Sequence, residues 1–134
     1  MTTINNNYKE YTVKVYKDRT EWFLNGKLHR KNDPAVEYAD GYKAWWVNGK
    51  RHREDGPAIE WADGSKEWWL NRKLHRENGP AIERANGTKE WYLNDIKYSE
   101  EQWKKEIAKI KNKNSCNGKI VEIDGKKYRL IEEK

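Results

Sequence analysis

The chain has 134 residues, of which 37% are charged, with a net charge of +6 and a mean hydropathy of −1.31. Such a polar composition is typical of disordered chains, but eight tryptophans and eight tyrosines can bury a large apolar area from few positions, which favours one folded domain with at most a small appendage. No run approaches the roughly 20 apolar residues of a membrane span, the polar residues 1–7 do not resemble a signal peptide, and a single cysteine, Cys116, favours a reducing compartment.

A period of 23 residues organises most of the chain. Three residue types recur at this spacing: Trp22, Trp45, Trp68 and Trp91; Asn25, Asn48, Asn71 and Asn94; His29, His52 and His75. Each unit predicts two short strands, such as 57–62 and 66–71, joined by an Asp-Gly hairpin turn, after which residues 72–79 return the chain to the next unit. Val13 to Tyr16 align with the first strand, so we expect the array to run from about Tyr8 to about Lys97.

The units differ at a few turn positions. The first unit has Asp33 where later units have Gly56 and Gly79, and Arg72 and Asp95 stand where other units have the glycine of Asn-Gly. Glycine is favoured where the backbone needs a positive φ. These three departures therefore predict locally altered turns within an otherwise regular array.

The repeated segment resembles a known family. The unit DGYKAWWVNGKRHREDGPAIEWA, which starts at Asp40, is similar to MORN-like (membrane occupation and recognition nexus) repeats, in the variant found in small proteins of tailed phages and bacteria. The resemblance covers about two thirds of the chain and implies a mainly β fold, a twisted antiparallel sheet of successive hairpins that serves as a binding scaffold. It also implies a phage-encoded protein in the bacterial cytoplasm that blocks a host component, such as an antiviral defence protein.

The last part of the chain predicts a helix and a second hairpin. Ser99 to Gln102 form a capping-box pattern, and Trp103, Ile107 and Ile110 give one apolar face to a helix over about 100–111. A polar loop over 112–118 follows, and then a hairpin over 119–131 with Asp-Gly at its turn. Because a repeat sheet has open ends, we expect residues 1–98 to form the array and residues 99–134 to cap it.

The recurring His-Arg pairs allow structural and functional interpretations. Equivalent atoms in successive units should lie about 9–10 Å apart, which is too far for neighbouring histidines to share a zinc ion. The favoured interpretation is that these residues cross-link the return loops, to the recurring Glu37, Glu60 and Glu83. The alternative is a ladder that holds an anionic ligand through His52, Arg53, His75 and Arg76.

Alternation along the second strand divides its aromatic residues between two faces. One face carries the uniform column of Trp22, Trp45, Trp68 and Trp91 with its aliphatic neighbours, and is expected to be structural. The other carries the more variable column of Phe23, Trp46, Trp69 and Tyr92 and is expected to be partly exposed. The first strand adds a column that changes from Tyr38 to Trp61 to Arg84. The predicted binding residues are Trp46, Trp69, Tyr92, Trp61, Arg84, His52, Arg53, His75 and Arg76.

These patterns favour a binding protein over an enzyme. No phosphate-binding loop, paired-cysteine motif or nucleophile elbow is present in the sequence, and no metal or cofactor is expected. A host protein is the expected partner, with a homodimer through sheet edges or ends as a further arrangement. The alternatives are a sponge that sequesters a nucleotide signal and an RNA or single-stranded DNA binder, although the positive charge is spread along the chain without one basic block.

Overall fold

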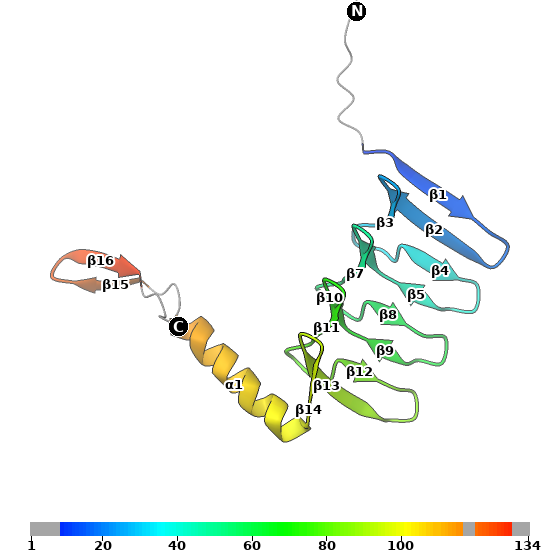
Figure 1. Cartoon of the computed structure of the whole chain (residues 1–134). Coiled ribbons are helices and arrows are strands. Elements are labelled where there is room, and N and C mark those ends of the chain that lie inside the picture. The colour runs from blue at the N-terminus through cyan, green and yellow to red at the C-terminus, as the bar shows by residue number, and fades with distance from the viewer. Residues whose placement is uncertain (1–8, 117–119, 130–134) are drawn as a thin grey trace, which may run out of the picture. The chain divides into compact units, whose positions relative to one another are not determined.

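A computed structural model describes residues 9–116 and 120–129, and the chain divides into two units, Met1–Lys97 and Tyr98–Lys134. The mainly β fold expected from the sequence is confirmed, with one C-terminal helix and one C-terminal hairpin (Figure 1). The elements are β1 (Tyr11–Val15), β2 (Arg19–Leu24), β3 (Lys27–Leu28), β4 (Val36–Tyr38), β5 (Lys43–Ala44), β6 (Trp46–Val47), β7 (Lys50–Arg51), β8 (Ile59–Glu60), β9 (Lys66–Glu67), β10 (Trp69–Leu70), β11 (Lys73–Leu74), β12 (Ile82–Glu83), β13 (Lys89–Leu93), β14 (Ile96–Tyr98), α1 (Glu100–Cys116), β15 (Ile120–Ile123) and β16 (Lys126–Arg129).

Successive hairpins build one 10-stranded antiparallel sheet, in the order β1-β2-β4-β5-β8-β9-β12-β13-β14, with β3 paired to β2 (Figure 1). Neighbouring strands follow each other along the chain because each unit contributes one hairpin. The register repeats with the sequence: Val36 lies opposite Ala44, and Ile59 lies opposite Glu67. Positive-φ glycines at Gly41, Gly64 and Gly87 form the tight turns of three of these hairpins.

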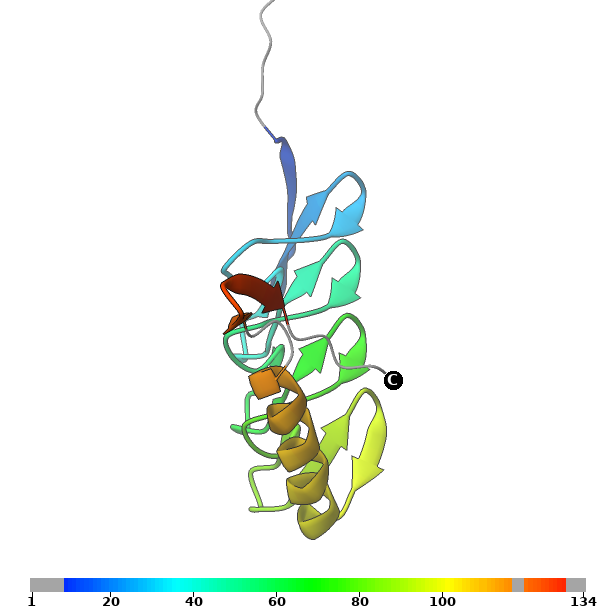
Figure 2. The same ribbon diagram turned by 90° about the vertical axis from the view of Figure 1, so that its left-hand side faces the viewer.

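The second strand of the two middle units is shorter than the sequence predicts. The expected strand over 66–71 is interrupted at Trp68: Lys66–Glu67 belongs to the main sheet, whereas Trp69–Leu70 forms a separate hairpin with Lys73–Leu74. Part of the expected return segment over 72–79 is therefore a strand. Figure 2 shows these short hairpins stacked from one unit to the next. Each of the two middle units thus has two hairpins, one that turns at Asp-Gly and one that turns at Asn48-Gly49 or Asn71-Arg72.

The prediction of altered turns is wrong for Arg72 and Asp95. These residues have φ of 70° and 67°, close to the 75° of Gly26 and Gly49 at the equivalent positions. The paired hairpin strands hold the turn geometry and impose a left-handed conformation on both residues. At the third departure the backbone does differ, since Asn32, next to Asp33, has a φ of 74°.

One cluster of the core lies on one face of the sheet, where Val36, Ala44 and Ile59 are 8%, 1% and 2% exposed. Their chain neighbours Ala35, Trp45 and Ala58 are also buried, so the core is not confined to that face. The half-buried residues Leu28, Tyr42, Trp46 and Trp69 pack against this cluster. The first strand of the chain does not contribute in the expected way. Val13 aligns with Val36 and Ile59 in sequence, but it is 40% exposed.

The cause is a shift of one residue in the register between β1 and β2. Lys14 lies opposite Glu21, whereas the repeat would place Val13 there. The connection through Asp18 and Arg19 lacks the Asp-Gly of the later hairpins, and the two strands that it joins pair one residue away from the register of the repeat. Because a slip of one residue moves every side chain to the other face, Val13 lies opposite Trp22 and does not join the core.

The C-terminal unit confirms the predicted capping box. The Ser99 hydroxyl accepts a hydrogen bond from Gln102 N–H at 3.2 Å, and the Gln102 side chain accepts one from Ser99 N–H at 3.3 Å. Trp103 and Ile107 are buried. The helix is longer than predicted and ends at Cys116, because no glycine or proline interrupts the sequence before Gly118; the expected loop at 112–116 is wrong.

The final hairpin is confirmed over the residues that the structure describes, with β15 and β16 paired around a turn at Asp124-Gly125. Residues 117–119 and 130–131 of the predicted loop and hairpin lie outside the described part of the chain. The capping role of residues 99–134 stays a prediction.

Candidate functional site

The recurring histidines connect each unit to the next. The His29, His52 and His75 rings accept, at Nδ1, hydrogen bonds of 3.0–3.1 Å from the backbone N–H groups of Asn48, Asn71 and Asn94. An Nδ1 that accepts is unprotonated, so the neutral ring carries its proton on Nε2. At His52 and His75 this nitrogen lies 3.5 Å and 3.3 Å from Glu54 and Glu77. The expected cross-link is present, but it reaches the next turn of the array and not the recurring Glu37, Glu60 and Glu83.

The recurring arginines do reach those glutamates. Arg30, Arg53 and Arg76 pair with Glu37, Glu60 and Glu83 at 3.2, 3.6 and 2.9 Å. Each guanidinium also donates to a proline carbonyl four residues later and stacks on the preceding tryptophan of the uniform column, at 3.7–4.0 Å from the ring centroid. These arginines therefore fasten the return loops to the sheet.

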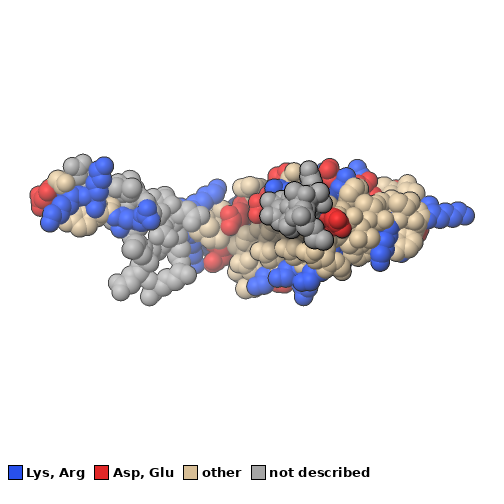
Figure 3. Space-filling model, turned by 90° about the horizontal axis from the view of Figure 1, so that it is seen from above, with Lys and Arg blue, Asp and Glu red and all other residues tan. Residues whose placement is uncertain are grey.

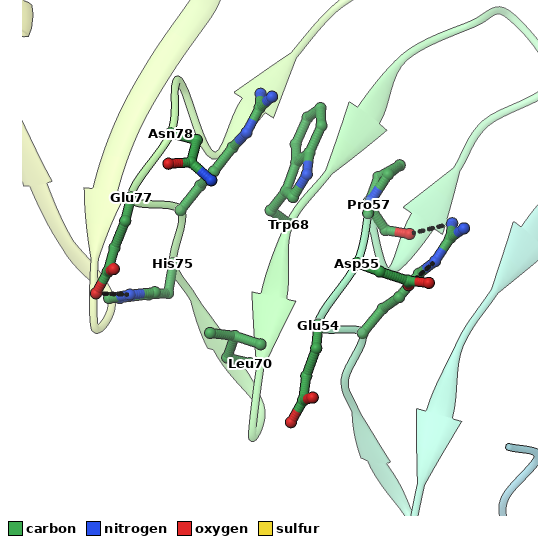
Figure 4. Close-up of a pocket in the computed structure, with 11 residues that line it drawn as sticks. Glu54, Asp55, Pro57, Trp68, Leu70, His75, Glu77 and Asn78 are labelled. Carbon is green, nitrogen blue, oxygen red and sulfur yellow. Dashed lines mark hydrogen bonds and ion pairs between the residues drawn. The ribbon is translucent and has the colours of Figure 1, made fainter. Parts of the chain in front are cut away.

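The return loops enclose two grooves, one unit apart, that we call the return-loop grooves. Trp68 and Leu70 lie between the loops at 53–57 and 75–78, in a groove of about 570 Å³ (Figure 4). Trp45 and Val47 occupy the same place in the preceding groove, of about 470 Å³. His52, Arg53, His75 and Arg76 of the predicted site line these grooves. Exposed carboxylates also line the rims, because the Glu54 and Asp55 side chains are 84% and 87% exposed.

Trp46 and Trp69 of the predicted site belong to the core face. Their rings lie on Arg51, whose guanidinium carbon is 5.3 Å and 5.2 Å from the two centroids. The Trp69 indole N–H donates to Glu67 at 2.9 Å. Both tryptophans are half-buried and pack against the hydrophobic core. The structure therefore gives these two residues a packing role in the middle of the array.

A second aromatic group lies at the turn ends of the first three hairpins. We define the aromatic patch as Tyr16, Tyr38, Tyr42 and Trp61. Tyr16, Tyr38 and Trp61 are 42%, 36% and 45% exposed. The Tyr38 and Tyr42 rings meet edge to face at 5.5 Å, and the Tyr42 and Trp61 rings at 4.9 Å. Arg19 connects the patch, with its guanidinium 4.0 Å from the Tyr16 centroid and 5.8 Å from that of Tyr38.

The patch contains a small pocket of about 330 Å³, which we call the aromatic pocket. It is lined by Tyr38, Asp40, Tyr42, Trp61 and Ala62. Burial raises the pKa of the Tyr42 hydroxyl, with smaller contributions from Glu67 and Tyr38 against an opposing one from Arg51. The Tyr42 ring packs against the core cluster, while Tyr38 and Trp61 are the exposed aromatic residues of the pocket.

The remaining predicted residues, Tyr92 and Arg84, meet at Glu90. The Tyr92 hydroxyl donates to this carboxylate at 3.1 Å, and Arg84 lies 3.8 Å from it. Burial and then the hydrogen bond to Glu90 raise the pKa of Tyr92. The structure thus divides the predicted residues between two regions. The return-loop grooves hold the histidines and arginines. The core face and the patch adjoin each other, because the indole N–H groups of Trp61 and Trp69 both donate to Glu67, at 3.2 and 2.9 Å.

Three observations concern other classes of site. Among the described residues, no group of His, Cys, Asp and Glu is arranged to hold a metal ion. No helix in the described part of the chain is long and apolar enough to cross a membrane. Figure 3 shows acidic and basic side chains interspersed on the face visible there, without a continuous basic surface among the coloured residues.

The comparisons with known proteins found no match: no family model, no curated protein and no solved structure is significantly similar to this chain.

Sequence reasoning missed Asp40, Tyr42 and Arg51. Asp40 recurs as Asp63 in the next unit and so gave no signal, whereas the other two differ from their equivalents: Tyr42 stands where later units have Ser65 and Thr88. Arg51 stands where the units on either side have Leu28 and Leu74. Departure from the repeat was therefore the signal that would have found Tyr42 and Arg51.

Proposed function

We propose that this protein is a non-enzymatic binding protein that docks a partner protein through the aromatic patch. The observation that carries the proposal is the exposed contact of Tyr38, Tyr42 and Trp61. Large aromatic side chains at the centre of an interface contribute much of its binding energy, and Tyr and Trp are enriched among such residues. The repeat scaffold has no need of them there, because the next unit has Ser65 and Arg84 at two of these positions.

The recurring histidines favour a scaffold over an enzyme. All three histidines of the chain use Nδ1 to accept a hydrogen bond from the next turn. A histidine that acts as a general base needs an accepting nitrogen directed at the substrate. Because Nδ1 of each histidine already accepts a backbone N–H of the next turn, these residues have a structural role and are poor candidates for a general base.

The grooves favour a protein partner over a nucleotide sponge. Arg53 is paired with Asp55 at 3.1 Å and stacked on Trp45, so its positive charge is already balanced by groups of the same chain. The exposed Glu54 and Asp55 at the rims repel an anionic ligand. The interspersed charges in Figure 3 likewise weaken the case for RNA or single-stranded DNA, which a continuous basic surface would attract.

We further propose that the array is MORN-like and that the protein is phage-encoded and acts on a host defence protein in the bacterial cytoplasm. The resemblance of the 23-residue units supports this part of the proposal. The hairpin architecture agrees with it, since each unit adds one hairpin to a continuous sheet.

The test compares three immobilised baits in bacterial lysate: the wild-type protein, Trp61→Arg and Glu54→Gln. The first variant introduces the residue that the next unit carries naturally, so the array can accommodate it. The second changes Glu54, an 84% exposed carboxylate at the return-loop grooves. A captured protein is then purified, and its affinity for each bait is measured by calorimetry.

We expect Trp61→Arg to weaken binding by at least about 30-fold, which corresponds to about 2 kcal/mol at a central aromatic residue. Glu54→Gln should bind as the wild type does. The reverse pattern would place the partner in the return-loop grooves. Capture that disappears with nuclease and falls steeply with salt would indicate a nucleic acid. A small-molecule adduct in native mass spectrometry would indicate the nucleotide sponge.

A further inference from the structure

The aromatic pocket offers a specific combination of groups: aromatic ring faces beside a carboxylate. Trp61 and Tyr38 provide partly exposed rings, Tyr42 provides the ring between them, and Asp40 stands at the rim. Asp40 Oδ1 accepts the Tyr42 N–H at 2.9 Å, which leaves Oδ2 directed elsewhere. In the described part of the chain, Asp40 has no ion pair, and no lysine or arginine stacks on Tyr42 or Trp61.

The chain contains three examples of a ring and a carboxylate that together hold an arginine side chain. In each of the first three units an arginine lies on a tryptophan and pairs with a carboxylate. The ring and carboxylate distances are 4.0 and 3.2 Å for Arg30 with Trp22 and Glu37, 3.9 and 3.1 Å for Arg53 with Trp45 and Asp55, and 3.7 and 2.9 Å for Arg76 with Trp68 and Glu83. A guanidinium satisfies both groups because its flat face stacks on the ring while its edge donates to the carboxylate.

The next unit supplies its own guanidinium at the place equivalent to the pocket. Arg84 replaces the aromatic residue there, and Ser65 replaces Tyr42. Arg84 lies 3.8 Å from Glu90. The hairpin that contains Tyr38 and Tyr42 therefore has more ring surface than the next hairpin. Among the described residues, the arginine that stacks within the patch, Arg19, lies over Tyr16 and Tyr38 and not over Tyr42 or Trp61.

From this comparison we infer that the aromatic pocket binds an arginine side chain of the partner protein, stacked on Trp61 and paired with Asp40. The partner class rests on the proposed function, whereas the chemistry rests on the pocket alone. Arginine is favoured over lysine because Trp61, which is 45% exposed, offers a flat ring surface on which a guanidinium can stack. A compact, strongly hydrated ammonium gains less from such a surface than a planar guanidinium.

The inference is tested with two small probes, N-acetyl-arginine methylamide and its uncharged analogue N-acetyl-citrulline methylamide. These probes have nearly the same shape and differ in charge. The readout is the chemical shift of the Trp61 indole N–H in a nitrogen-15 correlation spectrum, which reports on this one ring. We expect a saturable shift with the arginine probe and at least roughly fivefold weaker binding of the citrulline probe, the factor expected from an exposed cation–π contact.

Two variants form a matched pair, Asp40→Asn and Asp63→Asn. Both carboxylates accept the N–H of the residue two positions later, at 2.9 and 2.8 Å, so both substitutions change a hairpin turn in the same way. Only Asp40→Asn removes the carboxylate from the pocket. We expect it to weaken the arginine probe at least roughly fivefold and to leave the citrulline probe unchanged, and we expect Asp63→Asn to bind both probes as the wild type does.

The outcomes separate this inference from the proposed function. Equal binding of the two probes, no saturable shift at Trp61, or equal effects of the two variants would overturn the arginine inference. If Trp61→Arg still abolishes binding of the purified partner, the patch remains the docking surface without an arginine in the pocket. If the arginine probe binds as expected but Trp61→Arg leaves partner binding intact, the pocket chemistry is correct and the proposed docking surface is wrong.

Discussion

The histidine that joins the two middle units provides the most direct test of how the array is held together. His52 is 17% exposed at its side chain, and its Nδ1 accepts the Asn71 N–H at 3.0 Å. Replacing it with leucine removes the acceptor, whereas asparagine keeps an acceptor oxygen the same number of bonds from Cα. Loss of a neutral hydrogen bond costs about 0.5–1.5 kcal/mol. Because Asn71 is exposed and water can replace the acceptor, we expect about 1 kcal/mol and not the larger penalty of a buried, unpaired donor.

Amide hydrogen exchange measures this effect at the single affected N–H group. We expect protection of the Asn71 amide to fall about fivefold in His52→Leu relative to His52→Asn, which corresponds to about 1 kcal/mol. The Asn48 and Asn94 amides, which donate to His29 and His75, serve as internal controls and should keep their protection. Unchanged exchange at Asn71 in His52→Leu would refute the idea that the histidine ladder joins successive units.

Three further predictions concern stability. Arg72→Gly should raise the free energy of unfolding by up to about 1 kcal/mol, because Arg72 is held at a φ of 70° that disfavours side chains; urea unfolding measures it. Ile59→Ala, at 2% exposure, should cost about 2–5 kcal/mol, whereas Val13→Ala should cost under about 1 kcal/mol because the register shift leaves Val13 exposed. The raised pKa of Tyr42 means that the folded state favours its neutral form, so its contribution to the free energy of unfolding is full below about pH 10 and is lost as pH rises through the folded-state pKa. Between about pH 9 and 11, the melting temperature should therefore fall less with rising pH in Tyr42→Phe than in the wild type.

Each of these has a control and an outcome that contradicts it. Asp95 has a similar φ, but its carboxylate accepts the Leu74 N–H at 2.7 Å, so Asp95→Gly should bring no gain. A loss of stability in Arg72→Gly would show that the arginine side chain has a role of its own. Equal costs for Ile59→Ala and Val13→Ala would contradict the shifted register, and identical pH profiles for wild type and Tyr42→Phe would contradict the burial of the Tyr42 hydroxyl.

Much of the fold could be predicted from the sequence because its signals are local. The Asp-Gly and Asn-Gly turns and the capping box at Ser99 each act within a few residues, and the 23-residue period repeats the turn signals along the chain. The interruption of the strand at Trp68 could not be predicted, since 66–71 alternates without a break. The register of the first hairpin was also missed, because a difference of one residue in its connection outweighs the match of Val13 to the core column.

The candidate site depended on contacts between units, and these are invisible in any one unit. Departure from the repeat was a sound guide: Trp61 was found by it, and the same criterion applied to Tyr42 would have found the pocket. The recurring His-Arg pairs show the opposite case, since their recurrence reflects a structural task that every unit shares.

The sequence by itself determined the repeating hairpins, their turns and the division between recurring and varying positions, because these follow from backbone preferences and spacing. Only the tertiary structure decided that each histidine accepts from the next asparagine and that Trp46 and Trp69 pack on the core. It also decided that Tyr38, Tyr42 and Trp61 meet beside Asp40. Residues 19 or 23 positions apart become neighbours only when successive hairpins stack at strand spacing, and that stacking is a property of the whole array.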